Sequence, residues 1–469
     1  MDILFAFNYF VMRKKSFLLL CLGLSFASCE SEDDSYADID LSERLYAGGE
    51  TTIFSATSIS YRTPAPNLSA SDLATHLIGD TRFEDTFVTA PAEINSGLGP
   101  IFNNSSCISC HPNDGRPGFP NNLRSRSGLL IRASIAGSDE HLGPNPVPGF
   151  GLQIQNQALF GYNPEANYQV SFSEVTETFD DGTVVVLKKP TFSLLDSYIN
   201  LPTGIMLSPR IGTPVFGLGL LEEIPEATIL SHQDLNDSNG DGISGKANYV
   251  WNPETERTEL GRFGWKANTS TIRVQCASAY VEDMGITNFI FKNETGHNQF
   301  NGQDGLDDDP ELIEDTLKQV VLYCQTLGVP APRNLEKQAV RNGAKIFEEI
   351  ACAKCHIPKH VTGNSSISAL SNQTIFPYTD LLLHDMGEGL SDGRPDFLAG
   401  SSEWKTRPLW GIGLTFLING HTDFLHDGRA KSIEEAILWH GGEALNAKKK
   451  YKKLTRNQRN DLLEFINSL

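Results

Sequence analysis

The spacing of apolar residues predicts helices in the second half of the chain. Residues 271–284 and 310–327 each fit an amphipathic helix. Helical spacing returns between 340 and 350, again over 433–440, and in a final amphipathic stretch at 456–469. This pattern favours a mainly α protein.

Strict alternation of apolar and polar residues replaces the helical pattern between 129 and 220. Residues 151–155 and 168–172 alternate, and residues 183–187 follow Asp180-Asp181-Gly182, which is a hairpin turn signal. The sequence therefore predicts an antiparallel β insert within an otherwise helical chain.

Two Cys-x-x-Cys-His units lie 245 positions apart. They consist of Cys107, Cys110 and His111, and of Cys352, Cys355 and His356. This is the attachment motif of a c-type haem. Two thiols three positions apart can bond the two vinyl groups of one porphyrin, and the adjacent His can then bind the iron. The sequence thus predicts two covalently bound haems, because the alternative of paired zinc or disulfide sites does not need the His.

Breaks in these patterns divide the chain into four parts. The predicted parts are a signal segment (1–29), a tether and wrapping segment (30–100), an N-terminal haem domain (101–332) and a C-terminal cytochrome c domain (333–469). The fold prediction is therefore mainly α, with two cytochrome c-like haem domains and a β-rich insert in the N-terminal one.

Composition narrows the range of partners. The 469 residues are 39% apolar and carry a formal net charge of −20, with a pI near 5.0. This is a globular composition, and the negative charge argues against binding to nucleic acid. A small basic redox protein, such as a cytochrome or cupredoxin, would suit the overall charge better.

The N-terminus has the pattern of a lipoprotein signal. If translation starts at Met12, the basic residues 13–15 precede an apolar run at 16–26, and Ala27-Ser28-Cys29 is the cleavage site. Cys29 would then carry the lipid and be the only membrane attachment. We expect an exported protein at the outer membrane, facing the periplasm, or at the cell surface. An ordinary secretory signal is the alternative.

The loop at 234–248 has the residues of a calcium site. Asp237, Asn239 and Asp241 alternate before Gly242, as oxygen ligands do in calcium loops. However, Asn248 stands where an EF-hand has its bidentate Glu. The prediction is a calcium loop of another kind, with an Asx-rich turn as the alternative.

The two cysteines outside the signal and haem motifs leave two alternatives. In an oxidising compartment Cys276 and Cys324 can form a disulfide. Two buried thiols on neighbouring helices are the other interpretation.

Several short motifs carry a resemblance to a known family. They are Gly264-Trp265-Lys266-Ala267, Asp283-Met284-Gly285-Ile286-Thr287, Leu409-Trp410-Gly411 and Phe424-Leu425-His426-Asp427-Gly428-Arg429-Ala430. Together with the haem motifs, residues 70–469 resemble the bacterial di-haem oxidoreductases, which are described as peroxidases and are also labelled thiol oxidoreductases. That family is more distantly similar to bacterial di-haem cytochrome c peroxidases and to the di-haem enzyme that matures methylamine dehydrogenase.

The resemblance implies unequal roles for the two haems. The haem at His356 would receive electrons, and the haem at His111 would meet peroxide. Fourteen residues after His426, where the peroxidases have a Met ligand, this sequence has His440. The resemblance therefore implies His440 as the sixth ligand opposite His356, with Met386 as the alternative.

Further residues match the peroxidase spacing. Trp265 stands where a Trp lies between the two haems, although a buried core Trp is the alternative, and Gln275 stands where a Gln lines the peroxide pocket. Glu282 is the nearest carboxylate that could act as the acid in O–O cleavage. Ser127 occupies the position of the peroxidases' distal His, so either the first haem is open or another residue, such as His141, reaches it.

The expected function is that of a di-haem oxidoreductase of the cytochrome c peroxidase type. Two electrons reduce peroxide to water, and small redox donors refill the pair. One alternative is a lipid-anchored di-haem electron-transfer cytochrome without catalysis. Another is a di-haem enzyme that oxidatively modifies a partner protein.

Overall fold

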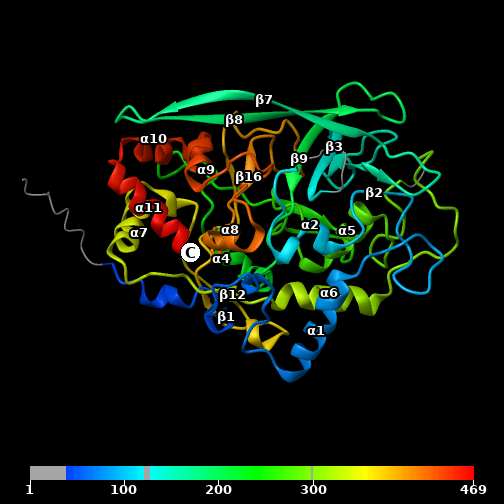
Figure 1. Ribbon diagram of the computed structural model, residues 1–469, viewed down its shortest axis with the longest axis horizontal. Coiled ribbons are helices and arrows are strands. Elements are labelled where there is room, and N and C mark those ends of the chain that lie inside the picture. The colour runs from blue at the N-terminus through cyan, green and yellow to red at the C-terminus, as the bar shows by residue number, and fades with distance from the viewer. Residues whose placement is uncertain (1–38, 121–126, 297–298) are drawn as a thin grey trace, which may run out of the picture. The chain divides into compact units, whose positions relative to one another are not determined.

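The computed structural model describes residues 39–120, 127–296 and 299–469 (Figure 1). These residues belong to one compact unit, and the boundary expected near 332 stays a prediction. The signal segment, Cys29 and the start of the tether lie outside the described residues. No helix among the described residues combines the length and the apolar character needed to cross a membrane.

The prediction of a mainly α fold is wrong. About 30% of the chain is helical and about 20% is strand. The described strands form seven sheets, six of them with two strands. Most of these strands are two to four residues long, which is too short for a periodic pattern to reveal them in a sequence.

In the described part of the chain, five helices of 12 to 15 residues supply most of the helical structure, and six shorter ones join them. The long helices are α1 (Ala70–Glu84), α5 (Ile272–Met284), α6 (Glu314–Thr326), α7 (Gln338–Glu349) and α11 (Arg456–Ser468). The shorter ones are α2 (Cys107–Cys110), α3 (Leu218–Glu222), α4 (Glu226–Leu230), α8 (Thr415–Asn419), α9 (Ile433–Trp439) and α10 (Leu445–Lys453).

The helices predicted over 271–284, 310–327, 340–350, 433–440 and 456–469 are confirmed within a few residues at each end. Helix α1 lies in the range where the sequence predicts a wrapping segment.

The same helix crossing occurs twice. Helix α1 packs on α6, and α7 packs on α11 (Figure 1). A side chain on Gly79 would meet the carbonyl of Gln319 in α6, and one on Gly343 would meet the carbonyl of Asp461 in α11. Glycine therefore lets the backbones approach closely at both crossings.

One turn beyond each glycine, a Phe faces the His of a Cys-x-x-Cys-His unit. The ring centroids of Phe83 and His111 are 6.2 Å apart, as are those of Phe347 and His356. The two halves thus place their haem motifs beside equivalent helix pairs.

The β insert between 129 and 220 is confirmed, and it is antiparallel. Strand β3 (Leu129–Ser138) pairs with β4 (Pro144–Asn145), β5 (Gln153–Ile154) and β9 (Met206–Ile211). Strand β7 (Asn167–Thr178) forms a hairpin with β8 (Val184–Leu195), and the turn lies at Asp180-Asp181-Gly182 as predicted.

The remaining strands form two-stranded pairs. They are β1 (Thr52–Ile53) with β12 (Val329–Pro330), β2 (Ile101–Phe102) with β6 (Gln157–Ala158), β10 (Tyr249–Asn252) with β11 (Arg257–Leu260), β13 (His360–Val361) with β14 (Thr374–Ile375), and β15 (Leu383–Asp385) with β16 (Glu403–Lys405).

The β7–β8 hairpin joins the two halves of the molecule. It runs along one side and ends over α10 (Figure 1). Glu177 near its tip accepts hydrogen bonds from Lys448 and Lys452 of α10, and Asp181 accepts one from Arg459 of α11. Segments 270 positions apart are therefore held together beside the second haem motif.

Candidate functional site

The first haem motif presents a free imidazole nitrogen to a cavity. Helix α2 carries Cys107 and Cys110, and His111 follows it. The Nδ1 atom of His111 donates to the carbonyl of Thr213 at 2.7 Å, which fixes the ring and leaves Nε2 available. Burial lowers the pKa of His111, so the ring stays neutral. All three side chains line a cavity of about 390 Å³, called here the first cavity.

The second motif repeats this arrangement. The Nδ1 atom of His356 donates to the carbonyl of Tyr378 at 2.9 Å. Burial lowers the pKa of His356 to about 4, so its Nε2 keeps the lone pair that a metal needs. Cys352, Cys355 and His356 line a cavity of about 630 Å³, called here the second cavity.

Both donor sets fit a c-type haem. The four cysteines are free thiols. Each pair lies beside a neutral His whose Nδ1 donates a hydrogen bond to a backbone carbonyl. The second ring nitrogen of a metal-binding histidine is usually held in this way. In each motif, the two cysteines and the histidine that the sequence predicts for haem attachment thus line one cavity.

The second cavity contains a further histidine with an available nitrogen. The Nδ1 atom of His440 donates to the carbonyl of Ala436 at 2.6 Å, and no hydrogen bond to its Nε2 is found among the described residues. Burial lowers the pKa of His440, as it does for His356. Met386, the alternative ligand, lines the same cavity, and the choice of a sixth ligand between the two residues stays a prediction.

Trp265 lines both cavities. Its Nε1 atom donates to the carbonyl of Ile211 at 2.8 Å, and only 8% of the residue is exposed. Trp404 lies edge-on to it at 6.5 Å, and His426 stacks on Trp404 at 4.0 Å. An aromatic group therefore lies on the wall that both cavities share, and the role that the resemblance implies for Trp265 stays a prediction.

Helix α5 presents polar residues to the first cavity. Gln275 and Glu282, seven positions apart, both line it. Glu282 forms an ion pair with Arg132 of β3, which ties up the carboxylate that the sequence nominates as the acid.

Asp283, the next residue, also lines the first cavity and is half-buried. Burial raises its pKa to about 7, although Gln153 donates a hydrogen bond to it at 2.7 Å. A protonated carboxyl is therefore available in this cavity near neutral pH.

His141 belongs to the same cavity. It comes from the turn between β3 and β4, and its ring stacks on Trp251 with centroids 3.8 Å apart. Its Nε2 atom lies 3.7 Å from a carboxylate oxygen of Glu140. Ser127 does not line this cavity and instead lies 3.3 Å from the hydroxyl of Tyr168.

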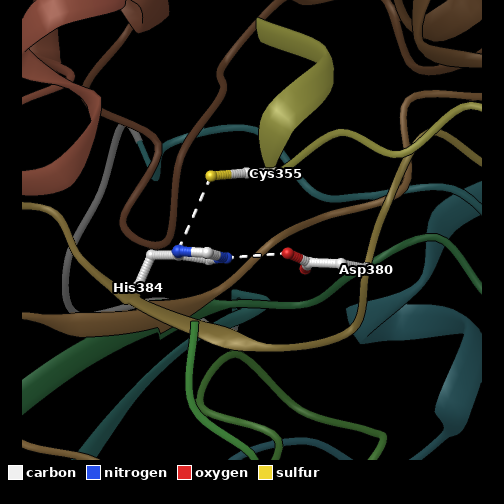
Figure 2. A group of neighbouring side chains, drawn as sticks. All are labelled: Cys355, Asp380 and His384. Carbon is white, nitrogen blue, oxygen red and sulfur yellow. Dashed lines mark hydrogen bonds and ion pairs between the residues drawn. The ribbon is translucent and has the colours of Figure 1, made fainter. Parts of the chain in front are cut away.

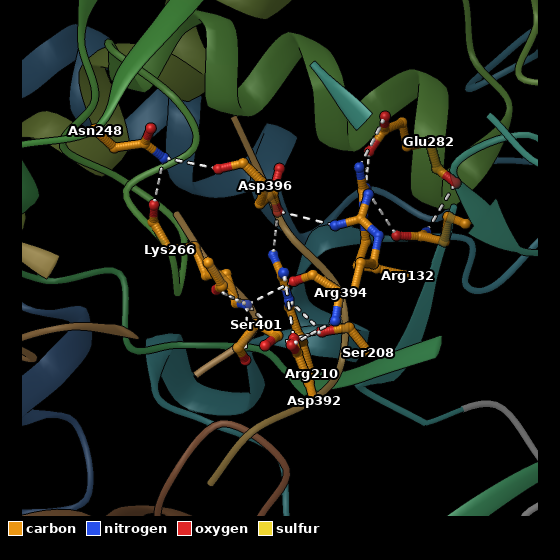
Figure 3. A network of polar contacts seen from close by, with 12 residues as sticks. Arg132, Ser208, Arg210, Asn248, Lys266, Glu282, Asp392, Arg394, Asp396 and Ser401 are labelled. Atoms are coloured by element: carbon orange, nitrogen blue, oxygen red, sulfur yellow. Dashed lines mark hydrogen bonds and ion pairs between the residues drawn. The ribbon is translucent and has the colours of Figure 1, made fainter. Parts of the chain in front are cut away.

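A buried ion network flanks the first cavity (Figure 3). Arg210 and Arg394 both donate to Asp396, at 2.9 and 3.0 Å, and Lys266 pairs with Asp392 at 2.9 Å. The neighbouring cations hold the pKa of Asp396 well below its usual range, against the opposing effect of burial. Each of these buried cations thus has a carboxylate partner, which offsets the cost of burying its charge.

In the loop predicted to bind calcium, the side chains form hydrogen bonds with the loop's own backbone. Asp237 accepts a hydrogen bond from the N–H of Gly242, Asn239 from that of Asp241, and Asp241 from that of Ile243. Asp241 also lies 3.4 Å from Lys354. This is the arrangement of an Asx-rich turn, and calcium binding there stays a prediction.

Among the described residues, two clusters of side chains are close enough to hold a metal ion, and neither includes this loop. One consists of Cys355, Asp380 and His384 (Figure 2), and it shares its thiol with the second haem motif. The other consists of Asp304, Asp308 and Glu311.

Cys276 and Cys324 are free thiols on the neighbouring helices α5 and α6. Contact with Cys276, followed by burial, raises the pKa of the Cys324 thiol. The structure thus has the unbridged arrangement.

Three further groups are missed by the sequence. Asp283, Arg116 and Arg407 all line a haem-motif cavity. No spacing rule singles them out, because their importance depends on burial and on contacts between residues far apart in the chain. For Asp283, the available signals are its adjacency to Glu282 and its place at the start of one of the family motifs.

Comparison with known proteins agrees with this geometry. A search of curated proteins gives no match. The family model described as "di-haem oxidoreductase, putative peroxidase" matches residues 41–469. The match spans both haem motifs, both cavities and the helix pairs beside them, so this chain belongs to the di-haem oxidoreductase family and has haem as its cofactor.

Proposed function

We propose that this chain is an exported c-type di-haem oxidoreductase that reduces peroxide beside His111 with electrons that enter beside His356. The observation that carries this proposal is the difference between the two cavities. The second cavity contains His440, whose Nε2 would bind the iron of a haem held there. In the first cavity, α5 presents the amide of Gln275 and the carboxyl of Asp283.

The cysteine pairs would each hold one haem through thioether bonds, and His111 and His356 would bind the irons. Haem supplies redox-active iron, and two haems together hold the two electrons that reduce one peroxide to two water molecules. His440 in the second cavity favours electron transfer there, because an iron with two protein ligands has no position for peroxide. Replacing a thioether ligand by imidazole also lowers the reduction potential.

The reduction needs two protons, and Asp283 can supply one. Its carboxyl is protonated below a pKa of about 7 and lines the cavity of His111. Glu282 is less suited, since it forms an ion pair with Arg132. The two adjacent carboxyl groups thus have different roles: Glu282 is the ion-pair partner of Arg132, and Asp283 is the proton donor.

Trp265 supports electron transfer between the cavities. Its indole lines both and is held by the carbonyl of Ile211. An aromatic ring at that place can carry an electron or hold a radical while the side chains around it stay fixed.

The electron donor would approach the second cavity beside α10. Lys449 and Lys453 line this cavity and are exposed, so they stand at its opening. The surface there is locally positive despite the net charge of −20. We therefore favour an acidic small redox protein as donor, rather than the basic one that the overall charge suggests.

Export and lipid attachment at Cys29 are part of the proposal and rest on the signal pattern alone. Intact mass and radiolabelled fatty acid would show a lipid on Cys29, and Cys29→Ser would remove it. A mature protein that keeps residues 12–28 would contradict the assignment.

Haem counting combined with turnover tests the proposed function. Intact mass should show two haems in the exported protein, and one in each of the double variants Cys107→Ser/Cys110→Ser and Cys352→Ser/Cys355→Ser. Only the protein with both haems should consume peroxide with a reduced cytochrome or cupredoxin as donor. Loaded protein that leaves peroxide untouched would be an electron carrier instead.

A further inference from the structure

A second group of cations lies between the two cavities and differs from the network beside the first. Two of its members are buried and the third is half-buried. It consists of Arg116, Lys405 and Arg407, which we call the central cations. Lys405 and Arg407 line both cavities, and Arg116 lines the second. The guanidinium carbons of Arg407 and Arg116 lie 5.1 and 5.9 Å from the ring centroid of Trp265.

None of the central cations has a carboxylate partner among the described residues. Arg116 donates to the carbonyl of Leu425, and its Nε has no partner although only 8% of the residue is exposed. Lys405 donates to the carbonyl of Arg262. Arg407 forms no hydrogen bond or ion pair with any described residue. By contrast, Arg132, Arg210, Lys266 and Arg394 each have a carboxylate within ion-pair distance (Figure 3).

Unpaired buried cations are costly. Desolvation, together with the smaller effect of the nearby Arg116, lowers the pKa of Arg407 to about 9. Burial likewise lowers the pKa of Arg116 to about 10. The face of Trp265 compensates only part of this cost, because a cation–π contact is weaker than a hydrogen-bonded ion pair. The central cations are therefore suited to bind anions in the two cavities, because no described carboxylate lies within ion-pair distance of them.

Each haem carries two propionate carboxylates, and the family assignment puts a haem in each cavity. A guanidinium matches a carboxylate in charge and in its two-pronged geometry. We infer that Arg407 binds carboxylates of both haems, and that Arg116 assists at the second haem. Arg407 thus electrostatically couples the two haems around Trp265.

This role predicts a change in the haem reduction potentials. A carboxylate that loses its cation stabilises the ferric haem, so the potential falls. It also binds a proton more readily, so the potential becomes dependent on pH where the carboxylate titrates. The inference needs haem in both cavities but does not need peroxide as the substrate, so a failed peroxide assay would leave it intact.

The test measures both haem potentials by spectroelectrochemistry on holoprotein between pH 5 and 8. Arg407→Gln should lower both potentials and add a pH dependence to both, whereas Arg116→Gln should do so mainly at the second haem. The matched control is Arg273→Gln on α5, which removes the same charge outside both cavities, where Glu254 and Glu314 pair with it. It should leave both potentials unchanged.

Two further measurements complete the test. Arg407→Lys keeps the charge but loses the two-pronged guanidinium geometry, so it should give smaller potential shifts in the same direction. It also replaces the Gln variant if that variant fails to fold. Potentials in Arg407→Gln that equal those of Arg273→Gln would overturn the inference. Acetate added to the unmodified protein at constant ionic strength should change neither potential; a shift would identify a free carboxylate as the occupant and also overturn it.

Discussion

His440 and His384 line the same cavity but differ in the nitrogen atoms that they leave available. His440 uses Nδ1 on the carbonyl of Ala436, which leaves Nε2 without a partner among the described residues. His384 is held at both nitrogens, by Asp380 at 2.8 Å and by Glu443 at 2.6 Å. Only His440 is therefore ready to bind iron without breaking a buried ion pair.

The first prediction concerns this difference. His440→Ala should convert one haem from low spin to high spin and leave the other unchanged, because it removes one axial ligand. Electron paramagnetic resonance and visible spectra of the holoprotein would show the change. Met386→Leu is the matched control and should leave both spectra as they are. The reverse result would assign the ligand to Met386.

The second prediction concerns the proton donor. Asp283→Asn should lower peroxide turnover by about 10²- to 10⁴-fold, the usual contribution of a general acid. The carboxyl donates only when protonated, so kcat/KM of the unmodified enzyme should fall as pH rises through about 7. Asp283→Asn should remove this limb of the pH profile.

Glu282→Gln provides the comparison, because Glu282 lines the same cavity and forms an ion pair with Arg132. It should keep the limb near pH 7. If Glu282→Gln removed the limb while Asp283→Asn kept it, the acid would be Glu282.

The third prediction separates two tryptophans. Trp265→Phe should cost about 1 kcal/mol of folding free energy for the lost hydrogen bond, but it should slow electron transfer between the haems several-fold in stopped-flow reoxidation by peroxide. Trp404→Phe also loses a hydrogen bond to a carbonyl, that of Leu390, and lines only the second cavity. Equal slowing in both variants would argue against a special position of Trp265.

The fourth prediction concerns stability and pH. Burial raises the pKa of Glu443, but hydrogen bonds from His384 and Ser244 lower it to about 2, and the carboxylates around His384 raise the pKa of that ring despite its burial. The contribution of Glu443 to folding stability is fully present above the ordinary carboxyl pKa of 4.5, and it is lost as the pH falls through about 2. The contribution of His384 to folding stability is fully present below the ordinary imidazole pKa of 6.5, and it is lost as the pH rises through the raised pKa of His384.

Glu443→Gln should therefore cost about 1–3 kcal/mol near pH 5.5, and the cost should shrink towards pH 2. Chemical unfolding at a series of pH values would measure it. Glu464→Gln, at an exposed position of α11, should be close to neutral throughout. A cost that does not depend on pH would contradict an ionic role for Glu443.

The long helices and the haem motifs could be predicted because their signals are local. Helix α11 has an amphipathic repeat and a capping box at Thr455 and Gln458. The attachment motifs have fixed spacing. Helix α1 was not predicted because its buried face consists of His76, Gly79 and Phe83, which gives a weak apolar pattern.

The mixed secondary structure and the central cations could not be predicted, because they depend on contacts between distant segments. Strand β12 pairs with β1 across more than 270 positions. Arg407 gains its importance only when Arg116 and Trp265 lie beside it. Charge and burial at such places follow from the fold and leave no periodic trace in the sequence.

Electron paramagnetic resonance of the half-reduced holoprotein, with and without peroxide or cyanide, tests the central claim most directly. The account predicts one haem with two protein ligands that does not respond, and one haem that binds cyanide and reacts with peroxide. Cys107→Ser/Cys110→Ser should abolish the responding signal. Two low-spin haems that ignore both ligands even after one-electron reduction would contradict peroxide chemistry beside His111.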